Sequence, residues 1–267
     1  MPESHAQVPP YTILELRERQ SQFALAVFVL NEGDRIRSQL EKMRVIAARV
    51  DIIIVDGGST DGVLEESVLR RCGVRALLVK TGGPRGLSAQ MRVGLSWCLE
   101  QGYEGIVIVD GNDKDDTTAV PSFVAALENG VDHVQGSRYV YGGRGIRTPT
   151  SRHLGVVLLH APLISLAAGK RFTDTTNGFR AYSKRFLEDP RVQPFRDVFV
   201  RYELHYYLAI RAARLGFRLA ELPVTRSYPA YGPLPSKIKG VRGNIAILQT
   251  LWDAVRGRFN PPEGSAT

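Results

Sequence analysis

Four short apolar runs alternate with stretches of helical periodicity in the first half of the chain. The runs are Phe23–Leu30, Asp51–Val55, Ala76–Val79 and Ile106–Val109. Short runs rich in β-branched residues indicate strands that are buried on both faces. The intervening residues 35–49 and 88–100 carry apolar positions at helical spacing. The alternation predicts an α/β fold with a mostly parallel sheet flanked by helices.

The second half contains one strongly apolar segment, Leu154–Gly169, interrupted by His160 and Pro162. It is shorter than the roughly 20 residues that span a bilayer. The segment therefore predicts a buried core helix, with a helix dipping into a membrane interface as the alternative, and no transmembrane segment. Residues 204–215 predict a further helix, and residues 217–224 predict a strand.

The C-terminal part predicts an amphipathic helix over residues 236–259. Its apolar positions are spaced by three and four residues: Ile238, Val241, Ile245, Leu248, Trp252, Val255 and Phe259. Lys239, Arg242 and Arg256 occupy other faces, and a basic amphipathic helix can lie on an anionic membrane. Packing of the apolar stripe on the preceding domain is the favoured interpretation. We expect one domain over residues 21–235, with tails at residues 1–20 and 260–267.

Charge and composition narrow the classes of partner. The 267 residues carry a net charge of +8 and are 43% hydrophobic, so a sizeable core and an anionic partner are both expected. Basic residues are spread along the chain and are not interleaved with aromatics, which argues against nucleic acid. Cys72 and Cys98 form no metal or redox motif, which favours a reducing, cytoplasmic setting.

Polar clusters follow each predicted strand, at Asn31–Asp34, Asp56–Gly62, Lys80–Gly86 and Asp110–Asp116. Ligands of open α/β sheets bind at the carboxyl ends of the strands. Carboxylates gathered there indicate a divalent cation that bridges phosphate oxygens, although an acidic helix-capping turn is the alternative. The glycine spacings of a dinucleotide-binding fingerprint and of a P-loop are absent.

These segments resemble the inverting glycosyltransferases of family 2, on the basis of Asn31-Glu32, Val55–Asp61 and Val109–Asn112. The resemblance covers residues 23–240 and implies a GT-A fold, a single α/β domain that binds a nucleotide sugar. Three later segments are similar to the dolichyl-phosphate mannose synthase branch of that family. They are Gly136–Tyr139, Asp174–Arg180 and Glu221–Val224.

The resemblance implies specific roles at the donor site. Asp56 would accept a hydrogen bond from the nucleotide base or ribose, and Glu32 would lie at the base pocket. Asp110 and Asn112 fall on the Asp-x-Asp motif that holds Mg²⁺ or Mn²⁺. The uncharged Asn112 would bind the cation less tightly, so Asp113, Asp115 and Asp116 are alternative ligands. Lys114 replaces a side chain that is often neutral in this branch.

Sugar transfer from a nucleotide diphosphate needs stabilisation of the anionic leaving group. A metal, Arg85, Lys114 and Lys237 are the candidates for this task. An alcohol acceptor also needs a general base, for which Asp174 is the only obvious candidate, whereas a phosphate acceptor needs none. The resemblance assigns Arg138 and Arg152 to the acceptor phosphate.

We therefore predict an inverting hexosyltransferase that acts on polyprenyl phosphate at the cytoplasmic face of a membrane. Asp110, Arg138 and Asp174 are its predicted catalytic residues. Three alternatives stay open: a family 2 enzyme with a saccharide or other soluble acceptor, a sugar nucleotidyltransferase, and a non-catalytic module that binds anionic ligands. The sequence leaves the oligomeric state open.

Overall fold

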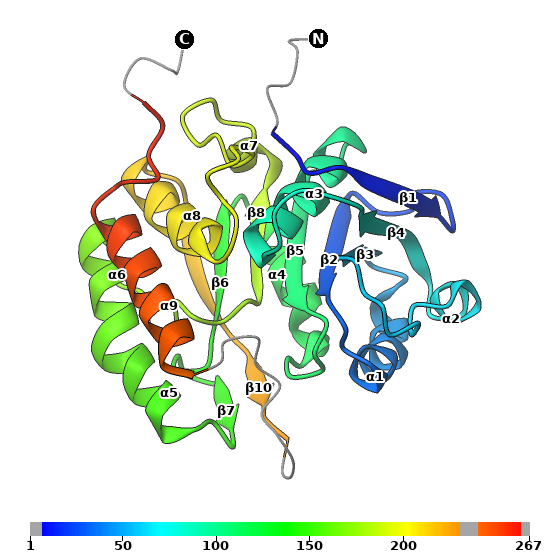
Figure 1. Ribbon diagram of the computed structural model, residues 1–267, viewed down its shortest axis with the longest axis horizontal. Helices are drawn as coiled ribbons and strands as arrows, with labels where there is room; N and C mark the ends of the chain where they lie inside the picture. The colour runs from blue at the N-terminus through cyan, green and yellow to red at the C-terminus, as the bar shows by residue number, and fades with distance from the viewer. Residues whose placement is uncertain (1–6, 230–239, 263–267) are drawn as a thin grey trace.

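The computed structural model describes residues 7–229 and 240–262. Its centre is an eight-stranded sheet with the order β1-β4-β3-β2-β5-β8-β6-β9 (Figure 1). The strands are β1 (Tyr11–Glu15), β2 (Phe23–Val29), β3 (Asp51–Asp56), β4 (Val74–Lys80), β5 (Gly105–Asp110), β6 (His133–Ser137), β8 (Arg180–Ser183) and β9 (Leu219–Pro223).

The four predicted strands form the parallel part of this sheet. β2 lies between β3 and β5 and pairs with both in parallel. From β2 the chain passes to β3 and β4 on one side and then crosses back to β5 on the other side. The loops after β2 and β5 therefore diverge and leave a crevice between them. β8 is antiparallel to β5 and β6, while β9 pairs with β6 in parallel, so the strand predicted at residues 217–224 is confirmed.

Helices cover both faces of the sheet, as predicted. One face packs on α1 (Asp34–Met43), α2 (Glu66–Arg71) and α4 (Val120–Glu128), and the other on α3 (Leu87–Glu100), α7 (Lys184–Leu187) and α8 (Glu203–Arg214). Side chains of β2 alternate between these two clusters, Leu25 and Val27 on the first and Ala26 and Phe28 on the second. Both faces are therefore buried, which explains the uninterrupted apolar runs.

The predicted N-terminal tail contains a strand. Tyr11–Glu15 pairs antiparallel with β4 at the edge of the sheet, so the predicted domain start at residue 21 is wrong. Most of β1 is exposed, and its sequence shows no buried run that would reveal it. Two 3₁₀ turns, Arg44–Ile46 and Thr117–Ala119, complete the connections in this half.

The apolar segment forms a surface helix of 19 residues, longer than predicted. It comprises α5 (Thr150–Gly155), a π-helical segment (Val156–His160) and α6 (Ala161–Ala168). By length and composition alone it could cross a membrane, with a mean hydropathy of 1.3, a test that core helices of soluble proteins also pass. Its inner face packs through Ile164, but Leu158 and Leu166 are 70% and 75% exposed. The prediction of a buried core helix is therefore wrong for its outer face.

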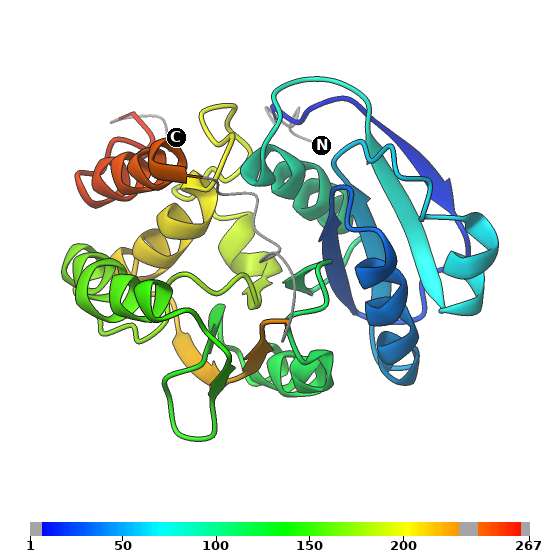
Figure 2. The same ribbon diagram turned by 60° about the horizontal axis from the view of Figure 1, so that its bottom comes forward.

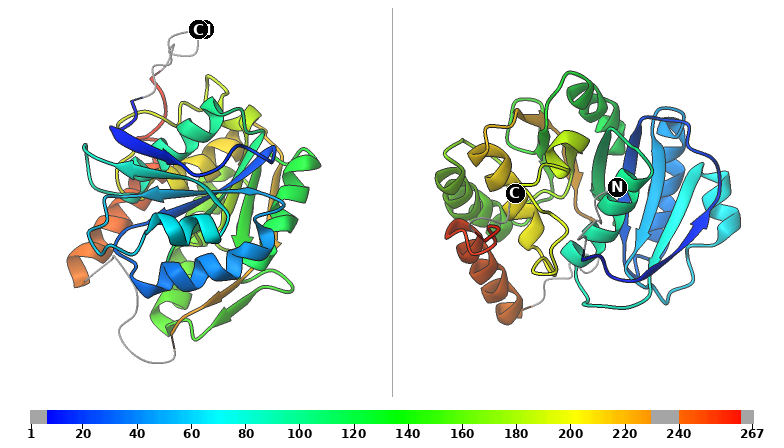
Figure 3. Two further views of the ribbon diagram at one scale, coloured as in Figure 1. Left: turned by 90° about the vertical axis from the view of Figure 1, so that its right-hand side faces the viewer. Right: turned by 90° about the horizontal axis from the view of Figure 1, so that it is seen from above.

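The C-terminal helix α9 (Gly240–Val255) packs on α6 and α8, as Figure 3 shows from above. Leu251 and Ala254 make the buried contact. Ile245, Leu248 and Trp252 from the predicted stripe are about half exposed, at 48%, 42% and 52%. Val255 and Phe259 of the stripe do pack against this cluster, so the predicted face is buried only toward its C-terminal end. Figures 1 and 2 show α5, α6, α8 and α9 grouped on the opposite side of the molecule from β1 and α2.

A small second sheet lies below the main one in Figure 1. β7 (Arg144–Ile146) pairs in parallel with β10 (Thr225–Ser227). The glycine-rich basic loop that precedes α5 is therefore joined to the segment that follows β9.

Candidate active site

A pocket of about 860 Å³ opens at the crevice between β2 and β5. The sheet side of its wall is polar and includes Glu32 after β2 and Asp110 at the end of β5. The helix side is apolar and includes Val156, Leu159 and Leu248. The pocket thus joins the predicted donor site to the exposed helices α5 and α9.

The wall of this pocket is strongly cationic. Two carboxylates, Glu32 and Asp110, line it together with seven basic side chains: Lys80, Arg85, Lys114, Arg138, Arg152, Arg180 and Arg226. Such an excess attracts a ligand that carries several phosphate groups, because guanidinium and ammonium groups donate charge-assisted hydrogen bonds to phosphate oxygens.

Arg226 of β10 lies between two carboxylates at the end of β5. Its Nη2 donates to Oδ2 of Asp110 over 3.0 Å, and its Nη1 donates to Oδ2 of Asp115. The Arg226 side chain is 8% exposed and that of Asp115 is fully buried. Although burial acts to raise the pKa of Asp110, the charges of Arg226 and Lys114 hold it below its ordinary value.

Lys114 is buried beside this pair and faces the pocket. Burial first, and the charge of Arg226 second, lower the pKa of its ammonium to about 8. Gly178 closes the opposite side, since a Cβ there would lie 3.1 Å from Oδ1 of Asp110. The Asp110 side chain is 25% exposed and faces the pocket on its remaining side.

The remaining acidic side chains of the run have other partners. Asp113 turns to α1, where Lys42 donates to its Oδ2 over 2.7 Å. Asp116 caps the 3₁₀ turn by accepting from the backbone N–H of Thr118 over 3.1 Å. As placed, the three alternative ligands Asp113, Asp115 and Asp116 do not line the pocket.

The predicted metal ligands do not fit a divalent cation. Asn112 donates its Nδ2 to Oδ2 of Asp110 over 3.3 Å, and its own Oδ1 is buried without a partner. In the described part of the chain, no three His, Cys, Asp or Glu side chains come together to hold a metal. The charges of Asp110 and Asp115 are already balanced by Arg226 and Lys114, which leaves one amide oxygen as the open ligand.

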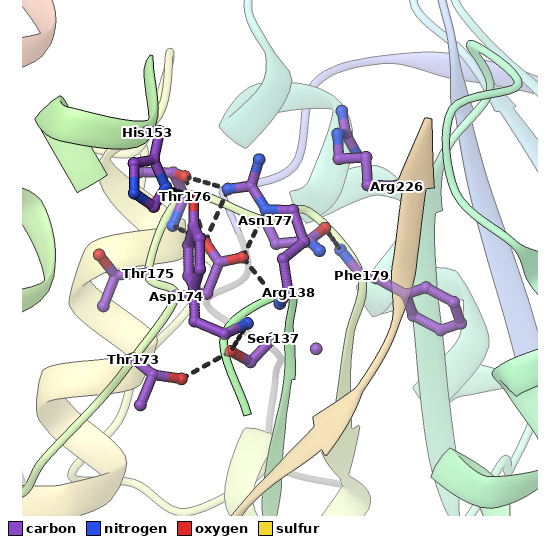
Figure 4. Close-up of polar contacts among 12 residues, drawn as sticks. Ser137, Arg138, His153, Thr173, Asp174, Thr175, Thr176, Asn177, Phe179 and Arg226 are labelled. Atoms are coloured by element: carbon purple, nitrogen blue, oxygen red, sulfur yellow. Dashed lines mark hydrogen bonds and ion pairs between the residues drawn. The ribbon is translucent and has the colours of Figure 1, made fainter. Parts of the chain in front are cut away.

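Arg138 and Asp174 form a buried forked ion pair, shown in Figure 4. Arg138 Nε lies 2.7 Å from Asp174 Oδ2, and its Nη2 lies 2.9 Å from Oδ1 and 3.0 Å from Oγ1 of Thr176. Asp174 is fully buried and does not line the pocket, whereas Arg138 does. As placed, the Asp174 carboxylate orients Arg138, and the role of Asp174 as a catalytic base stays a prediction.

The other predicted residues fall into two groups. Glu32, Arg85 and Arg152 line the pocket, and Glu32 also accepts from Arg35 Nη2 over 2.9 Å. Asp56 does not line it. Its carboxylate accepts from the backbone N–H and hydroxyl of Ser59, and burial raises its pKa, so as placed it closes the turn after β3.

Lys237 lies outside the described residues, and so do Ile238 and Lys239 from the predicted helix.

Sequence reasoning missed two arginines of the pocket, Arg226 and Arg180. Arg180 donates to the backbone carbonyls of Thr175, Asn177 and His205, and no carboxylate within residues 7–229 and 240–262 forms an ion pair with it. Arg180 belongs to the segment Asp174–Arg180 that resembles the mannose synthase branch, and this resemblance could have indicated it. Arg226 stands in an ordinary strand-like segment and offered none.

Comparisons with known proteins agree with this geometry. The profile "Glycosyl transferase family 2" matches residues 25–190, more than half of the chain. The site is thus that of a sugar-transferring enzyme built on a nucleotide-binding sheet. The chain belongs to glycosyltransferase family 2.

Two relatives align over most of their length and of this chain. An undecaprenyl-phosphate mannosyltransferase of Micrococcus luteus is 28% identical over 83% of this chain and 90% of its own. A polyprenol monophosphomannose synthase of Mycolicibacterium smegmatis is 26% identical over 88% and 87%.

A solved structure confirms the GT-A fold. Glucosyl-3-phosphoglycerate synthase of Mycobacterium tuberculosis, in complex with Mn²⁺, uridine diphosphate and phosphoglyceric acid, superimposes with a TM-score of 0.62 at 17% identity. The match covers 92% of this chain and 80% of that one.

Proposed function

We propose that the protein transfers a hexose, with inversion, from a nucleotide-diphosphate sugar to a polyprenyl phosphate on the cytoplasmic face of a membrane. The observation that carries this proposal is the two-sided pocket. Its cationic sheet end suits a diphosphate, and its apolar helix end, at Val156, Leu159 and Leu248, suits the first units of a lipid chain. The relatives that bear such names support the same acceptor class.

Two basic side chains of the pocket, Arg138 and Arg152, come from the segment between β6 and α6. Arg138 is held by Asp174, and Arg152 lies on α5 with its guanidinium carbon 5.7 Å from the Tyr228 ring centre. Both line the pocket, Arg138 from the end of β6 and Arg152 from α5. We assign them to the acceptor phosphate, whose ionised oxygen attacks the sugar without a base, while the donor diphosphate leaves toward Lys114 and Arg85.

The carboxylates of the pocket argue against an alcohol acceptor. Glu32 and Asp110 are the only ones among the described lining residues, and both already accept from arginines. His160 and His205 also line the pocket and are the other candidates for a base, although burial lowers the pKa of both and so weakens them as bases. An enzyme with a soluble acceptor is therefore the second candidate, and His160→Gln and His205→Gln would abolish its turnover.

The exposed helix faces support contact with a membrane surface. Leu158, Leu166 and Trp252 project from α5–α6 and α9, and Arg256 lies over the Trp252 ring. Apolar side chains beside basic ones are typical of proteins that lie on anionic lipid. We infer that these helices bring the pocket to the lipid surface, where the acceptor phosphate resides.

The deciding experiment is transfer of labelled sugar into organic-extractable lipid. Purified protein is given polyprenyl phosphate and GDP-mannose, UDP-glucose or UDP-N-acetylglucosamine in separate reactions. We expect one donor to label the lipid, and Arg152→Gln to raise KM for the lipid about tenfold or more. Arg185→Gln, at the opposite edge of the sheet, is the control. Label in a soluble saccharide alone would refute the lipid acceptor.

A further inference from the structure

The acidic end of β5 already contains a cation that belongs to the chain. Arg226 reaches in from β10, 116 residues away in sequence from Asp110, and donates to Asp110 and Asp115. A guanidinium between two carboxylates stands where the strand-end motif would place a metal ion. It supplies a delocalised positive charge that is weakly hydrated and fitted to anionic oxygens.

Backbone contacts fix Arg226 in this position. Asp115 and Arg226 form an isolated antiparallel bridge. The N–H of Asp116 donates to the carbonyl of Thr225 over 3.0 Å, and the N–H of Ser227 donates to the carbonyl of Lys114 over 2.7 Å. Backbone hydrogen bonds thus join β10 to the acidic loop on both sides of Arg226. They hold the guanidinium at the site in the absence of ligand.

The charge balance leaves little attraction for a metal ion. The carboxylates of Asp110 and Asp115 carry two negative charges, and Arg226 and Lys114 carry two positive charges. A divalent cation at Asp110 would have to displace Arg226, whose guanidinium would then remain buried without this carboxylate. The open amide oxygen of Asn112 is a weak replacement for the lost carboxylate ligand.

The two cations of this cluster face the pocket, beside two further basic side chains. Lys114 and Arg226 both line it, as do Lys80 and Arg85. A diphosphate in the crevice therefore meets positive side chains without an ion carried in from solution. The structural relative bound to Mn²⁺ shares only the fold at 17% identity, so its ion does not decide this case.

We propose that Arg226 occupies the cation position of the Asp110 site, and that Arg226 and Lys114 neutralise the donor diphosphate in place of a divalent metal. The inference deepens the proposed function and rests on it. It makes Arg226 a residue of the donor site, and it makes binding of the nucleoside diphosphate independent of metal.

Binding of UDP and GDP to the full-length protein, measured by calorimetry in EDTA and in Mn²⁺, tests this inference. We expect one of them to bind in EDTA within about threefold of its affinity in Mn²⁺. A loss of tenfold or more in EDTA would overturn the inference and leave the proposed function standing. Binding in neither condition would overturn both.

A gain-of-metal variant tests the position of Arg226 directly. In Asn112→Asp/Arg226→Met the guanidinium is removed and a second carboxylate is restored. We expect this variant to bind one Mn²⁺, measured as loss of the free-ion EPR signal, while the wild-type protein and Arg17→Met bind none at that site. Arg17 pairs with the buried Asp51 at the opposite edge of the sheet and is the matched control.

Two outcomes would contradict the assignment. One is stoichiometric Mn²⁺ binding by the wild-type protein that Asp110→Asn removes. The other is a folded double variant that binds no Mn²⁺. Arg226→Lys separates charge from structure, because it keeps a cation without the fork. It should retain metal-free diphosphate binding within about tenfold, whereas Arg226→Met loses more.

Discussion

The two ends of the pocket are built in opposite ways. At the sheet end, charged side chains are buried and paired, as Arg138 is with Asp174 and Arg226 with Asp110. At the helix end, the helices that line the pocket also expose apolar side chains on their outer faces, such as Leu158 at 70% and Trp252 at 52%. Buried charges cannot move without losing partners, so changes at the sheet end should affect chemistry and stability together. Changes at the helix end should affect contact with lipid alone.

The largest effect is expected from Asp174→Asn, which leaves the Arg138 guanidinium buried without its carboxylate. The free energy of unfolding should fall by about 3–5 kcal/mol, measured by urea denaturation. Asp189→Asn breaks the more exposed pair with Arg191 and should cost about 1 kcal/mol or less. Equal losses in the two variants would mean that the Arg138–Asp174 pair contributes no more to the free energy of unfolding than a surface pair.

Asp110→Asn should reduce sugar transfer by about 10²–10³-fold, because it removes a charge that positions Arg226 and Lys114 at the diphosphate. The measurement is kcat/KM for the donor. Asp113→Asn is the control, since Asp113 lies three residues away but pairs with Lys42 on α1. Matching losses in both variants would contradict the distinct position of Asp110.

Raising the pH should lower kcat/KM for the donor, because Lys114 at the sheet end of the pocket loses its charge. Lys114 has a pKa of about 8 and is charged below that pH, so kcat/KM for the donor should fall about tenfold between pH 7 and pH 9. Lys114→Arg stays charged and should flatten this part of the profile. A wild-type profile that is flat up to pH 9 would show that the ammonium is not needed.

The smallest effects belong to the helix end. Leu158→Gln and Trp252→Gln should change the free energy of unfolding by no more than about 0.5 kcal/mol, because both side chains are largely exposed. Each should nevertheless weaken sedimentation with anionic vesicles about fivefold, the loss of roughly 1 kcal/mol of apolar burial in lipid. Val45→Gln, an exposed apolar residue on the other side of the sheet, is the control. Unchanged vesicle binding in both helix variants would argue against the membrane face.

The strands β2 to β5 and β9, and the helices α1, α3 and α8, were predictable because their signals are local. Val107 and Val109 are buried in the core and belong to a continuous apolar run, and such a run by itself indicates a strand with both faces buried. β1 escaped prediction because an exposed edge strand needs no apolar run, and its partner lies more than 60 residues away. On α9 the spacing was correct, but which face packs depends on α6 and α8.

The site was predictable where ligand-facing residues follow strands directly. Glu32, Asp110 and Lys114 were found in that way and do line the pocket. The state of each side chain was not predictable, because it depends on distant partners. Asp174 resembles a free base in sequence until Arg138, 36 residues away, takes both of its oxygens. The role of Arg226 depends on the pairing of β10 with the acidic loop, which the sequence does not indicate.

The backbone bridge between Asp115 and Arg226 has a consequence for turnover. A metal ion can depart together with the nucleoside diphosphate, and a new one must then arrive before the next donor. A cation that is part of the polypeptide stays in the site, so the nucleoside diphosphate leaves without a metal ion. The site can then bind the next donor without first binding a new ion. On our proposal, the cellular supply of manganese or magnesium would therefore not limit the cycling rate of this enzyme.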